Sequence, residues 1–560
     1  MPVANANIAR HLGAMAAARP QAPALKVPHG RTRSGDIDYL TLTFAELDQE
    51  VAAWCIRLAA RGVGRGDRTL VMVRPGLPLI ASVFALFRLG AVPVVIDPGM
   101  KLKNFLPCVA RTRPRALIGI PLAQWISRLF RRSFQSLAVR VPASASTTAR
   151  LFRGPAASAL PNPAPAFSSA KDLAAILFTS GSTGTPKGVC YEHGMFEAQV
   201  RLIGETFAIA PGEVDLPLLP IFALFNPALG MTTIVPEMNP RRPAAADPAK
   251  IVQAIRQEQV TNSFGSPTLW GRIADYCRGR DLTLPSLRRV LCAGAPVPRA
   301  LWSLSLPLLP NGRLHSPYGA TEALPVSSIA SDEAEPLASA PPGRLEGAGA
   351  CVGRPLPGIE ARIVSLIAGP IATLAEAREL PQGEIGEIIV QGAHVTREYD
   401  RLPEATRRAK IAGGESGPEG SRAAVWHRMG DCGHFDSAGR LWYCGRQAEI
   451  VATPEGPMFT EPCEQVFRRH PEVVRCALIG LGQPGRQTPA LVVEARIRRG
   501  RRPAFARELR TLARADPATA AISRFFFRAR FPVDVRHNAK IHRLALAKWA
   551  APRRPLICPA

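Results

Sequence analysis

The stretch Leu177-Phe-Thr-Ser-Gly-Ser-Thr-Gly-Thr-Pro-Lys-Gly188 decides how the rest of the chain is interpreted. The apolar run from Leu173 to Phe178 at its start predicts a short buried strand. The glycines that follow allow the backbone to bend close to a ligand, and the hydroxyls and amides around them can donate hydrogen bonds to an anion. A lysine adds a compact positive charge suited to phosphate oxygens. The stretch therefore predicts a phosphate-binding loop, whose candidate contacts are Thr179, Ser180, Gly181, Ser182, Thr183, Gly184 and Lys187.

Two alternatives for this loop fit the sequence less well. A Walker A loop would place glycine before the lysine and Ser or Thr after it, whereas Pro186 and Gly188 flank Lys187. A flexible Ser/Gly/Thr linker would not be expected to follow a buried strand directly and to end in Pro-Lys-Gly. The stretch instead resembles the phosphate loop of the adenylate-forming superfamily, which includes acyl-CoA ligases, luciferases and peptide-synthetase adenylation domains. In that superfamily the loop grips the phosphates of ATP.

The composition predicts a globular protein of two or more domains. The chain has 560 residues, of which 47% are hydrophobic and 20% charged, so it is too long for one core and too apolar for general disorder. Its net charge of +26 comes mainly from arginine, because only nine of the 70 basic residues are lysines. An excess of basic over acidic residues can indicate nucleic acid or an anionic membrane as a partner. The arginines form scattered pairs without interleaved aromatics, so we interpret the charge as compositional and expect no nucleic-acid partner.

The cysteines and the apolar runs indicate where the protein is located. The eleven cysteines are single, without the Cys-x-x-Cys or His/Cys spacing of a metal site. Without a secretory signal pattern at the N-terminus, they predict reduced thiols and a cytoplasmic protein. The longest uncharged run, Leu216 to Pro236, contains four prolines that would break a membrane-spanning helix. We therefore interpret this run as buried loop and strand and expect no transmembrane segment.

Strand and helix patterns alternate through the first half of the chain, which predicts a parallel sheet covered on both faces. Residues 1 to about 36 show a short helical pattern, Ile8 to Ala18, followed by a polar loop. Thr43, three residues before Glu46, predicts a capping box that opens a helix. A β-rich section begins near Gly386. The other expected elements are strands at 69–73, 91–96, 260–264, 289–293 and 384–390, and helices at 78–89, 195–207 and 249–257.

Two motifs farther along the chain extend the resemblance to the adenylate-forming superfamily. They are Gly294-Ala-Pro-Val297, which follows a predicted strand, and Tyr318-Gly-Ala-Thr-Glu322. An aromatic face suits a purine, and a carboxylate suits a hard cation that bridges phosphates. The resemblance implies an ATP site in which Gly294, Ala295 and Pro296 line the adenine, Tyr318 beside Gly319 lies flat on it, Thr321 contacts the α-phosphate and Glu322 holds Mg²⁺.

A third motif resembles the ribose-binding part of the same superfamily. Met429-Gly-Asp-Cys-Gly-His-Phe-Asp-Ser-Ala-Gly-Arg440 predicts a hairpin with a glycine turn, and it leads to Leu441-Trp-Tyr-Cys-Gly-Arg446. The resemblance implies that Asp431 accepts both ribose hydroxyls and that Arg446 reaches the ribose or a phosphate. A carboxylate can accept two hydrogen bonds from a cis-diol.

The resemblance also implies the domain organisation. Residues 1–446 would form an AMP-binding domain of parallel βα sheets plus a distorted β-barrel, and residues 447–560 a small, mobile α+β domain that rotates between half-reactions. The C-terminal stretch Phe531-Pro-Val-Asp-Val-Arg-His-Asn-Ala-Lys540 carries the lysine that bridges carboxylate and α-phosphate in the superfamily. A cation at this place would stabilise the negative charge that develops there. Ala539 replaces the glycine that usually precedes this lysine.

Some features differ from those of thioester-forming members of the superfamily. Ala223 stands where those members usually carry a histidine, and Ala448 stands at the hinge, where they carry Asp or Lys. The loop after the hinge, Ala452-Thr-Pro-Glu-Gly-Pro457, contains two prolines instead of a basic residue with glycine. From about Leu42 to Trp549 the chain looks instead like the β-lactone synthetases of bacterial long-chain olefin biosynthesis (OleC). The resembling stretches begin at Phe222, Phe264, Ala293, Val425 and Phe531.

This second resemblance implies the reaction. A 2-alkyl-3-hydroxy fatty acid would be adenylated by ATP with Mg²⁺, and its own β-hydroxyl would then displace AMP to give a cis-β-lactone and, from the first step, diphosphate. His193 and His537 are positional candidates for a base. Assembly with other enzymes of the pathway is also implied. Two alternatives stay open, a long-chain acyl-CoA or acyl-AMP ligase and an inactive nucleotide-binding scaffold. The candidate catalytic residues are Lys540, Glu322, Thr321 and Lys187, and the candidate substrate pocket is Phe222, Phe225, Phe264 and Gly265.

Overall fold

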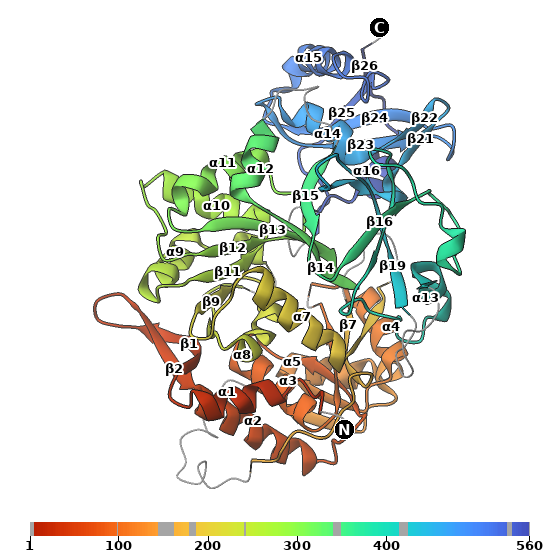
Figure 1. Cartoon of the computed structure of the whole chain (residues 1–560). Coiled ribbons are helices and arrows are strands. Elements are labelled where there is room, and N and C mark those ends of the chain that lie inside the picture. Colours follow the sequence, from red (N-terminus) through yellow and green to blue (C-terminus); the bar gives the residue numbers. More distant parts are fainter. Residues whose placement is uncertain are drawn as a thin grey trace.

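The computed structural model describes residues 5–97, 99–143, 162–178, 186–239, 242–339, 349–413, 424–534 and 540–558. Strands within these ranges form sheets of six, fourteen, two and four strands. Figure 1 shows the N-terminal elements at one end of the molecule and the C-terminal elements, drawn in blue, at the other end. The mixed α/β architecture, with a separate small C-terminal sheet, confirms the predicted fold class.

The six-stranded sheet contains the strand that was predicted to precede the phosphate loop. That strand, β7 (Leu173–Phe178), has the predicted bounds, and it pairs with β8 (Gly188–Glu192) on its other side. Phe178 is the register partner of Gly188, and a Cβ at Gly188 would lie 2.7 Å from the Phe178 ring. Glycine is therefore required where the chain returns from the loop. The order is β6–β5–β3–β4–β7–β8, parallel except for β8, with β3 (Arg68–Met72), β4 (Val92–Ile96), β5 (Ala116–Gly119) and β6 (Val139–Pro142).

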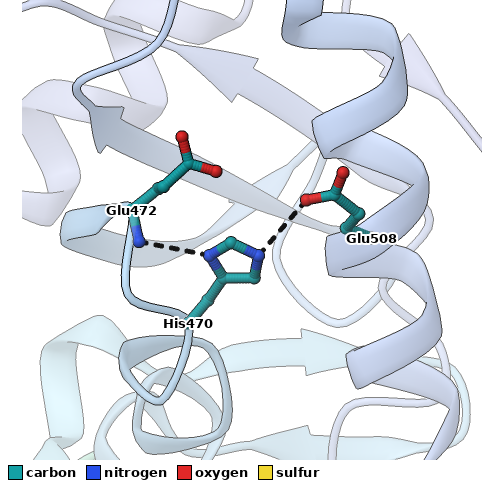
Figure 2. Close-up of side chains that lie close together, drawn as sticks. All are labelled: His470, Glu472 and Glu508. Atoms are coloured by element: carbon teal, nitrogen blue, oxygen red, sulfur yellow. Dashed lines mark hydrogen bonds and ion pairs between the residues drawn. The ribbon is translucent and has the colours of Figure 1, made fainter.

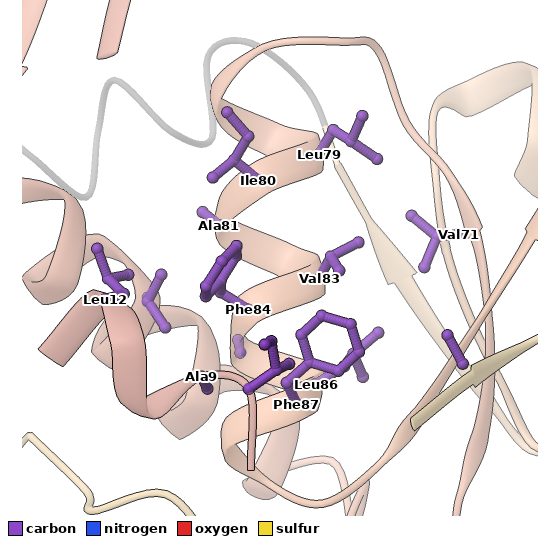
Figure 3. Close-up of a cluster of buried hydrophobic side chains, with 14 of the residues drawn as sticks. Ala9, Leu12, Val71, Leu79, Ile80, Ala81, Val83, Phe84, Leu86 and Phe87 are labelled. Carbon is purple, nitrogen blue, oxygen red and sulfur yellow. The ribbon is translucent and has the colours of Figure 1, made fainter. Parts of the chain in front are cut away.

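Helices from the N-terminal part of the chain pack into a large apolar core beside this sheet. Thr43 and Glu46 form the predicted capping box of α2 (Phe44–Ala59): the Thr43 hydroxyl accepts from the Glu46 amide, and the Glu46 carboxylate accepts from the Thr43 amide. Almost every residue of α3 (Leu77–Arg88) is buried, and Figure 3 shows Phe84 on the side of this helix that faces Leu12. The other helices here are α1 (Arg10–Ala18), α4 (Leu102–Thr112), α5 (Pro121–Leu129) and the 3₁₀ turn η1 (Arg131–Phe134).

One half of the fourteen-stranded sheet is parallel, and its last strands lie next to the candidate site. Its parallel order is β13–β12–β11–β9–β10–β1, and β2 is antiparallel at the edge. The strands are β1 (Pro23–Arg31), β2 (Ile37–Thr43), β9 (Val214–Pro217), β10 (Thr232–Ile234), β11 (Asn262–Gly265), β12 (Arg289–Cys292) and β13 (Arg313–Ala320). The helices between them are α7 (His193–Thr206), α8 (Asn226–Leu229), α9 (Pro248–Gln257), α10 (Pro267–Arg278) and α11 (Arg299–Leu308), with 3₁₀ turns η3 (Pro220–Leu224) and η4 (Pro243–Ala245).

The other half of this sheet is antiparallel; it contains the β-rich section that was predicted to begin near Gly386, but three of its strands come earlier in the chain, between residues 323 and 364. It continues from β13 through β14, β15, β20, β19 and β17 to β16, with β18 paired to β19, and the described pairing is an open path. These strands are β14 (Ala323–Ala330), β15 (Ala350–Pro355), β16 (Glu360–Val364), β17 (Gly386–Gln391), β18 (Lys410–Gly413), β19 (Ala424–Phe435) and β20 (Leu441–Arg446). The section also contains α12 (Ser331–Ser339), η5 (Leu374–Glu376) and α13 (Pro403–Ala409).

The C-terminal part of the chain has its own sheet and its own apolar cores. Two buried clusters here draw their members only from residues 451–550. The sheet order is β23–β24–β25–β26, and a short hairpin of β21 and β22 precedes it. The elements are η6 (Gln447–Glu449), β21 (Val451–Thr453), β22 (Gly456–Met458), α14 (Thr460–Arg468), β23 (Val473–Leu481), β24 (Thr488–Ala495), η7 (Arg499–Arg501), α15 (Arg502–Arg514), β25 (Arg524–Phe527), α16 (Arg543–Ala550) and β26 (Leu556–Ile557).

The structure differs from the expectation for the N-terminus. Residues 23–36 were expected to be a polar loop, but β1 and β2 form a hairpin that adds an edge to the large sheet through Leu25 and Lys26, the partners of β10. Pro23, Pro28 and Gly30 interrupt the apolar alternation that marks a strand, and a proline is tolerated at a strand's first residue and at irregular positions. None of the helices in the described part of the chain has the length and apolar composition needed to cross a bilayer.

Candidate active site

A cavity of about 2030 Å³ brings together most of the residues that the sequence singled out. Its walls come from the loop after β12, from β13, β19 and β20, and from the C-terminal segment that contains α14 and α16. The predicted residues that line it are Lys187, Phe222, Phe264, Gly294, Ala295, Pro296, Tyr318, Gly319, Thr321, Glu322, Asp431, Arg446 and Lys540. Residues Thr179, Ser180, Gly181, Ser182, Thr183 and Gly184 lie outside the described ranges.

Asp431 connects Tyr318 and Arg446, an aromatic and a basic side chain that were both predicted to contact the nucleotide. The Tyr318 hydroxyl donates a 2.7 Å hydrogen bond to Asp431 Oδ2, and Arg446 Nε lies 3.0 Å from Oδ1. Asp431 and Arg446 are register partners across β19 and β20, which explains why two residues so far apart in the sequence meet. Burial and the nearby Asp431 carboxylate raise the pKa of Tyr318 well above its usual value, so this phenol remains a hydrogen-bond donor.

Tyr399 organises the predicted metal and phosphate end of the cavity. Its hydroxyl donates a 2.7 Å hydrogen bond to Glu322 Oε1, and the Lys187 Nζ lies 4.7 Å from the centre of its ring. The backbone carbonyl of Glu322 accepts a 2.9 Å hydrogen bond from the amide of Thr396. This bond ties the residues just before Tyr399 to the backbone of Glu322. The Tyr399 side chain thus lies between the Glu322 carboxylate and the Lys187 ammonium group. The carboxylate is suited to bind a metal cation, and the ammonium group is suited to bind phosphates.

Backbone contacts hold Tyr399 against the strand that follows the phosphate loop. Tyr399 forms an isolated bridge with Val189 of β8, and the Asp400 amide donates to the Gly188 carbonyl at 2.7 Å. Arg68 of β3 forms an ion pair with the Asp400 carboxylate at 2.9 Å. The six-stranded sheet therefore positions Lys187 and Tyr399 together, although more than two hundred residues separate them.

Lys540 reaches the same cavity from the C-terminal segment. Burial lowers the pKa of its ammonium group, and the neighbouring Arg446 charge lowers it further, whereas Asp431 opposes this effect. The backbone around Lys540 is anchored because its amide donates to Asp534 Oδ1 at 2.9 Å. A lysine held among buried charges has lost hydration, which strengthens its interaction with an anionic ligand.

The α16 helix that follows Lys540 is fixed by a buried ion-pair network. Arg543 donates to Glu464 Oε1 and Oε2 at 2.6 and 2.7 Å, and to Glu449 Oε2 at 2.9 Å. Arg468 adds a 2.7 Å bond to Glu464, whose side chain is fully buried. Glu449 lies directly after the predicted hinge, so the network joins the hinge to the segment that carries Lys540.

Two glycines in the predicted adenine region are needed for their backbone geometry. Gly294 has a φ of +100°, a conformation that residues with a side chain rarely adopt. A Cβ at Gly319 would lie 2.4 Å from the carbonyl oxygen of Ala323, which is closer than atoms can approach. Both glycines line the cavity that Tyr318 also lines.

The candidate substrate pocket has a second, small apolar cavity behind it. Phe222 and Phe264 stack with ring centroids 3.6 Å apart, and they line both the large cavity and this small one of about 40 Å³. Phe225 lines only the small cavity, and Gly265 lines neither but packs against the indole of Trp270. Asp215 also lines the small cavity, and its carboxylate accepts hydrogen bonds from Asn226 and Asn262 at 2.8 and 2.6 Å. Burial raises the pKa of Asp215 to about 6.

The structure separates the two histidines that were candidates for a base. His193 lies in the N-terminal core, where it accepts a 3.3 Å hydrogen bond from the Ile8 amide and packs edge-on against Phe87. Burial lowers its pKa to about 4, and it does not line the cavity. The structure therefore gives His193 a packing role. His537 lies outside the described residues.

One other group of described side chains has the composition of a metal site. His470, Glu472 and Glu508 lie close together in the C-terminal segment, as Figure 2 shows. His470 Nε2 lies 3.3 Å from Glu508, and its Nδ1 already accepts from the Glu472 amide. Arg501 forms ion pairs with both carboxylates. Because an arginine already neutralises this group, we interpret it as a structural charge cluster.

Comparison with known proteins identifies the family. Residues 14–400 match the family model described as AMP-binding enzyme. The chain belongs to the AMP-binding enzyme family. It is similar to the olefin beta-lactone synthetase of Xanthomonas campestris pv. campestris, with 44% identity over 98% of both chains. It is equally similar to the olefin beta-lactone synthetase of Stenotrophomonas maltophilia, with 44% identity over 97% of this chain and 98% of the relative.

A solved structure supports the fold of this AMP-binding enzyme. The amide bond synthetase McbA from Marinactinospora thermotolerans superposes with a TM-score of 0.77 over 98% of this chain and 99% of its own, at 22% identity. At this identity the likeness concerns the fold alone. Together with the family match, it confirms the predicted superfamily, and the protein is an adenylate-forming ligase.

Sequence reasoning missed three residues near the candidate catalytic groups of this AMP-binding enzyme. Tyr399 was not singled out, because a lone tyrosine carries no motif. Lys410 and His427 are register partners on β18 and β19, and both are buried. Lys410 donates to the carbonyl of Thr396, the residue whose amide binds Glu322, and its charge interacts with that of Glu322. The scarcity of lysine in the sequence was the one signal that pointed to Lys410.

Proposed function

We propose that this AMP-binding enzyme is an ATP-dependent β-lactone synthetase that acts on long-chain 2-alkyl-3-hydroxy fatty acids. The observation that carries the proposal is the near full-length similarity to two relatives named olefin beta-lactone synthetase. The cavity geometry supports it, because the candidate adenine, ribose and phosphate groups and Lys540 line one space. A runner-up, an acyl-CoA or acyl-AMP ligase, would use the same first half-reaction.

The first step forms an acyl-adenylate. A carboxylate oxygen of the substrate attacks the α-phosphorus of ATP, and diphosphate leaves. Lys540 would stabilise the charge on the attacking oxygen and the α-phosphate, and Lys187 would bind the departing phosphates. Asp431 and Tyr318 would orient the nucleoside so that attack proceeds in line.

The second step closes the ring. The β-hydroxyl oxygen attacks the acyl carbon, the bond to the phosphate oxygen breaks, and AMP leaves while the hydroxyl proton passes to a base or to solvent. The nucleophile belongs to the same molecule, so its high effective concentration offsets part of the ring strain. No thiol acceptor is needed, in agreement with Ala223 and Ala448 at positions where thioester-forming members differ.

We propose that Glu322 holds Mg²⁺. Its Oε1 is oriented by Tyr399, and no described residue forms a hydrogen bond with its Oε2, so one carboxylate oxygen can face a cation in the cavity. When bound, the metal would supply charge neutralisation to the phosphate oxygens of ATP.

We also propose a boundary between two domains at Arg446, with residues 447–560 as a mobile unit. The separate sheet and the separate apolar clusters after residue 451 support this division. Limited proteolysis should cut between residues 446 and 456 and release the C-terminal fragment intact. An adenylate analogue should slow this cleavage, whereas cleavage at scattered sites on both sides would contradict the boundary.

The cellular setting is part of the proposal as well. All eleven cysteines are free thiols, which suits the reducing cytoplasm. By resemblance to the β-lactone synthetases, we propose assembly with other enzymes of the olefin pathway, to be tested by co-purification of the tagged enzyme with those neighbours.

A product assay tests the reaction directly. The enzyme is incubated with a long-chain 2-alkyl-3-hydroxy acid, ATP and Mg²⁺, with and without CoA, and products are identified by NMR at low temperature. We expect β-lactone and AMP without CoA. A thioester that forms only with CoA would establish the ligase instead, and no AMP with any acid would favour an inactive scaffold. Lys540→Ala should slow product formation by about a hundredfold to a thousandfold, and Lys548→Ala, at an exposed lysine on α16, serves as the matched control.

A further inference from the structure

One face of α5 carries an exposed apolar stripe. Leu122, Trp125 and Leu129 are 45%, 59% and 55% exposed, which is unusual for side chains of this size. Their spacing of three and four residues places them along one side of a helix. Most of the remaining large exposed apolar side chains of the described residues are scattered singly over other elements. The stripe on α5 is therefore a continuous feature.

The opposite face of α5 is firmly anchored. Ala123, Gln124 and Ser127 are buried, and the Gln124 side chain donates to the carbonyls of Gly119 and Val141 at 3.3 and 3.1 Å. These bonds tie the helix to the C-terminal ends of the neighbouring strands β5 and β6. The exposed stripe is thus presented by a rigid element of the fold, and its exposure does not result from a loose helix.

The segment of sequence that contains the stripe carries charge of one sign. Residues 98–171 contain twelve Lys and Arg residues and no Asp or Glu, so this stretch contributes +12 of the total charge of +26. Arg128 on α5 and Arg131 and Arg132 on η1 are exposed, and none of them forms an ion pair with a described carboxylate. In contrast, the exposed Arg407 and Arg408 of α13 both form ion pairs with Glu404 of the same helix. The basic residues beside the stripe therefore keep their charge available for an anionic partner.

We propose that α5 and η1 dock onto the surface of an anionic lipid bilayer. Tryptophan and leucine would enter the interface between headgroups and acyl chains, and Arg128, Arg131 and Arg132 would bind the lipid phosphates. An acidic protein would match the charge but would leave the protruding Trp125 and its two leucines without an apolar partner of defined shape. Nucleic acid would satisfy the arginines but not the leucines. A bilayer satisfies both features at once.

The proposal goes beyond the catalysed reaction and does not depend on it. It places the enzyme at a membrane surface by a helix that lies in the interface without spanning the bilayer. If the substrate is a long-chain fatty acid, as proposed above, the same contact would bring the enzyme to the phase in which such acids partition.

Vesicle co-sedimentation of the full-length enzyme tests the inference. Vesicles of phosphatidylcholine alone and vesicles that also contain phosphatidylglycerol are compared at low and high salt. We expect binding to the anionic vesicles that weakens as salt increases, and at least about tenfold weaker binding to the neutral ones. Equal binding to both, or none to either, would overturn the proposal.

Matched variants locate the contact. Leu122→Ser with Trp125→Ser and Leu129→Ser should remove most binding, and Arg128→Glu with Arg131→Glu and Arg132→Glu should weaken it by about a hundredfold. The controls are Leu306→Ser, at an exposed leucine on α11, and Arg496→Glu with Arg498→Glu and Arg499→Glu, a second basic cluster in the C-terminal segment. Loss of binding in the second cluster's variant alone would assign the contact elsewhere and overturn the proposal.

A spectroscopic readout separates insertion from general adhesion. Brominated lipids should quench part of the tryptophan fluorescence of the bound wild type, and this quenched part should be absent in Trp125→Phe. All substituted side chains are exposed, so the melting temperature of each variant should match that of the wild type. Quenching that is unchanged in Trp125→Phe would show that the indole does not enter the bilayer.

Discussion

The hydroxyl of Tyr399 donates a 2.7 Å hydrogen bond to the carboxylate of Glu322, and the two residues come from elements that meet only in the folded chain. Burial and the nearby Glu322 carboxylate raise the pKa of Tyr399, so it remains a donor at any physiological pH. The same ring carries Lys187 above it. Tyr399 therefore fixes the distance between the candidate metal ligand and the candidate phosphate ligand.

Tyr399→Phe should impair the adenylation step without unfolding the enzyme. The substitution keeps the ring under Lys187 and removes one hydrogen bond to a charged group, worth about 1.5–3 kcal/mol. We expect a loss of roughly tenfold to a hundredfold in kcat/KM, measured by ATP–diphosphate exchange, and a higher Mg²⁺ concentration for half-maximal rate. Tyr276→Phe, on α10 and outside the cavity, is the control. An unchanged Mg²⁺ dependence would contradict an orienting role.

Asp431→Asn should act mainly on nucleotide binding. The amide keeps the shape of the side chain but removes the charge that pairs with Arg446 and the acceptor strength that serves Tyr318. We expect the KM for ATP to rise by about tenfold or more, with a smaller change in kcat. The kinetic measurement is ATP–diphosphate exchange over a range of ATP concentrations. Asp275→Asn, in an exposed pair on α10, should leave both constants unchanged.

Lys540→Ala should separate binding from chemistry. The residue lies among Arg446 and Asp431 at the cavity wall, and its charge would act on the reacting carboxylate and α-phosphate. Loss of one such electrostatic contact typically reduces kcat by about a hundredfold to a thousandfold. We expect ATP affinity, measured by calorimetry, to change little. A comparable loss of affinity would assign Lys540 to ATP binding and not to the transition state.

The elements predicted most reliably were those with strong local signals. The strand Leu173–Phe178 is a continuous apolar run, and the capping box of Thr43 and Glu46 places both members within one helical turn. In the candidate site, Tyr318, Asp431 and Lys540 were singled out because each lies in a motif. The structure adds that their side chains converge on one cavity, which no single motif could establish.

The features that the sequence did not reveal depend on contacts between distant segments. Tyr399 acquires its role from Val189 and Glu322, and Arg543 acquires its role from Glu449 and Glu464. No local pattern marks either residue. The β1–β2 hairpin was missed for a related reason, because its pairing with β10 supplies the stability that its own sequence does not indicate.

Phe264→Ala should change the chain length of the preferred substrate. The ring stacks on Phe222 and separates the large cavity from the small apolar one behind it. Its removal would join the two cavities, so we expect a shift of kcat/KM towards acids with a longer chain. The cost in stability should be about 3–5 kcal/mol, as for other buried phenylalanines. Phe467→Ala, in the C-terminal core, is the control for stability, and it should leave the chain-length preference unchanged.

Lys410→Met should change how the stability of the enzyme depends on pH. Burial lowers the pKa of Lys410 from 10.5 to about 7, while Glu322 opposes this effect and Arg397 and Lys187 add to it. The partner His427 has a pKa held well below its usual value, so it stays neutral above pH 6.5 or so.

Below pH 7 or so, Lys410 is charged in both the folded and the unfolded chain, and its full burial cost weakens the fold. Between about 7 and 10.5 the unfolded chain binds the extra proton, so stability of the wild type rises with pH through this side chain. Methionine fills the site without a charge, so the stability of the variant does not show this rise with pH. The melting temperature of Lys410→Met minus that of the wild type should therefore decrease from about pH 6.5 to about pH 9. The exposed Lys548→Met should show a constant difference, and a constant difference for Lys410→Met would mean that its ammonium group keeps its charge when buried.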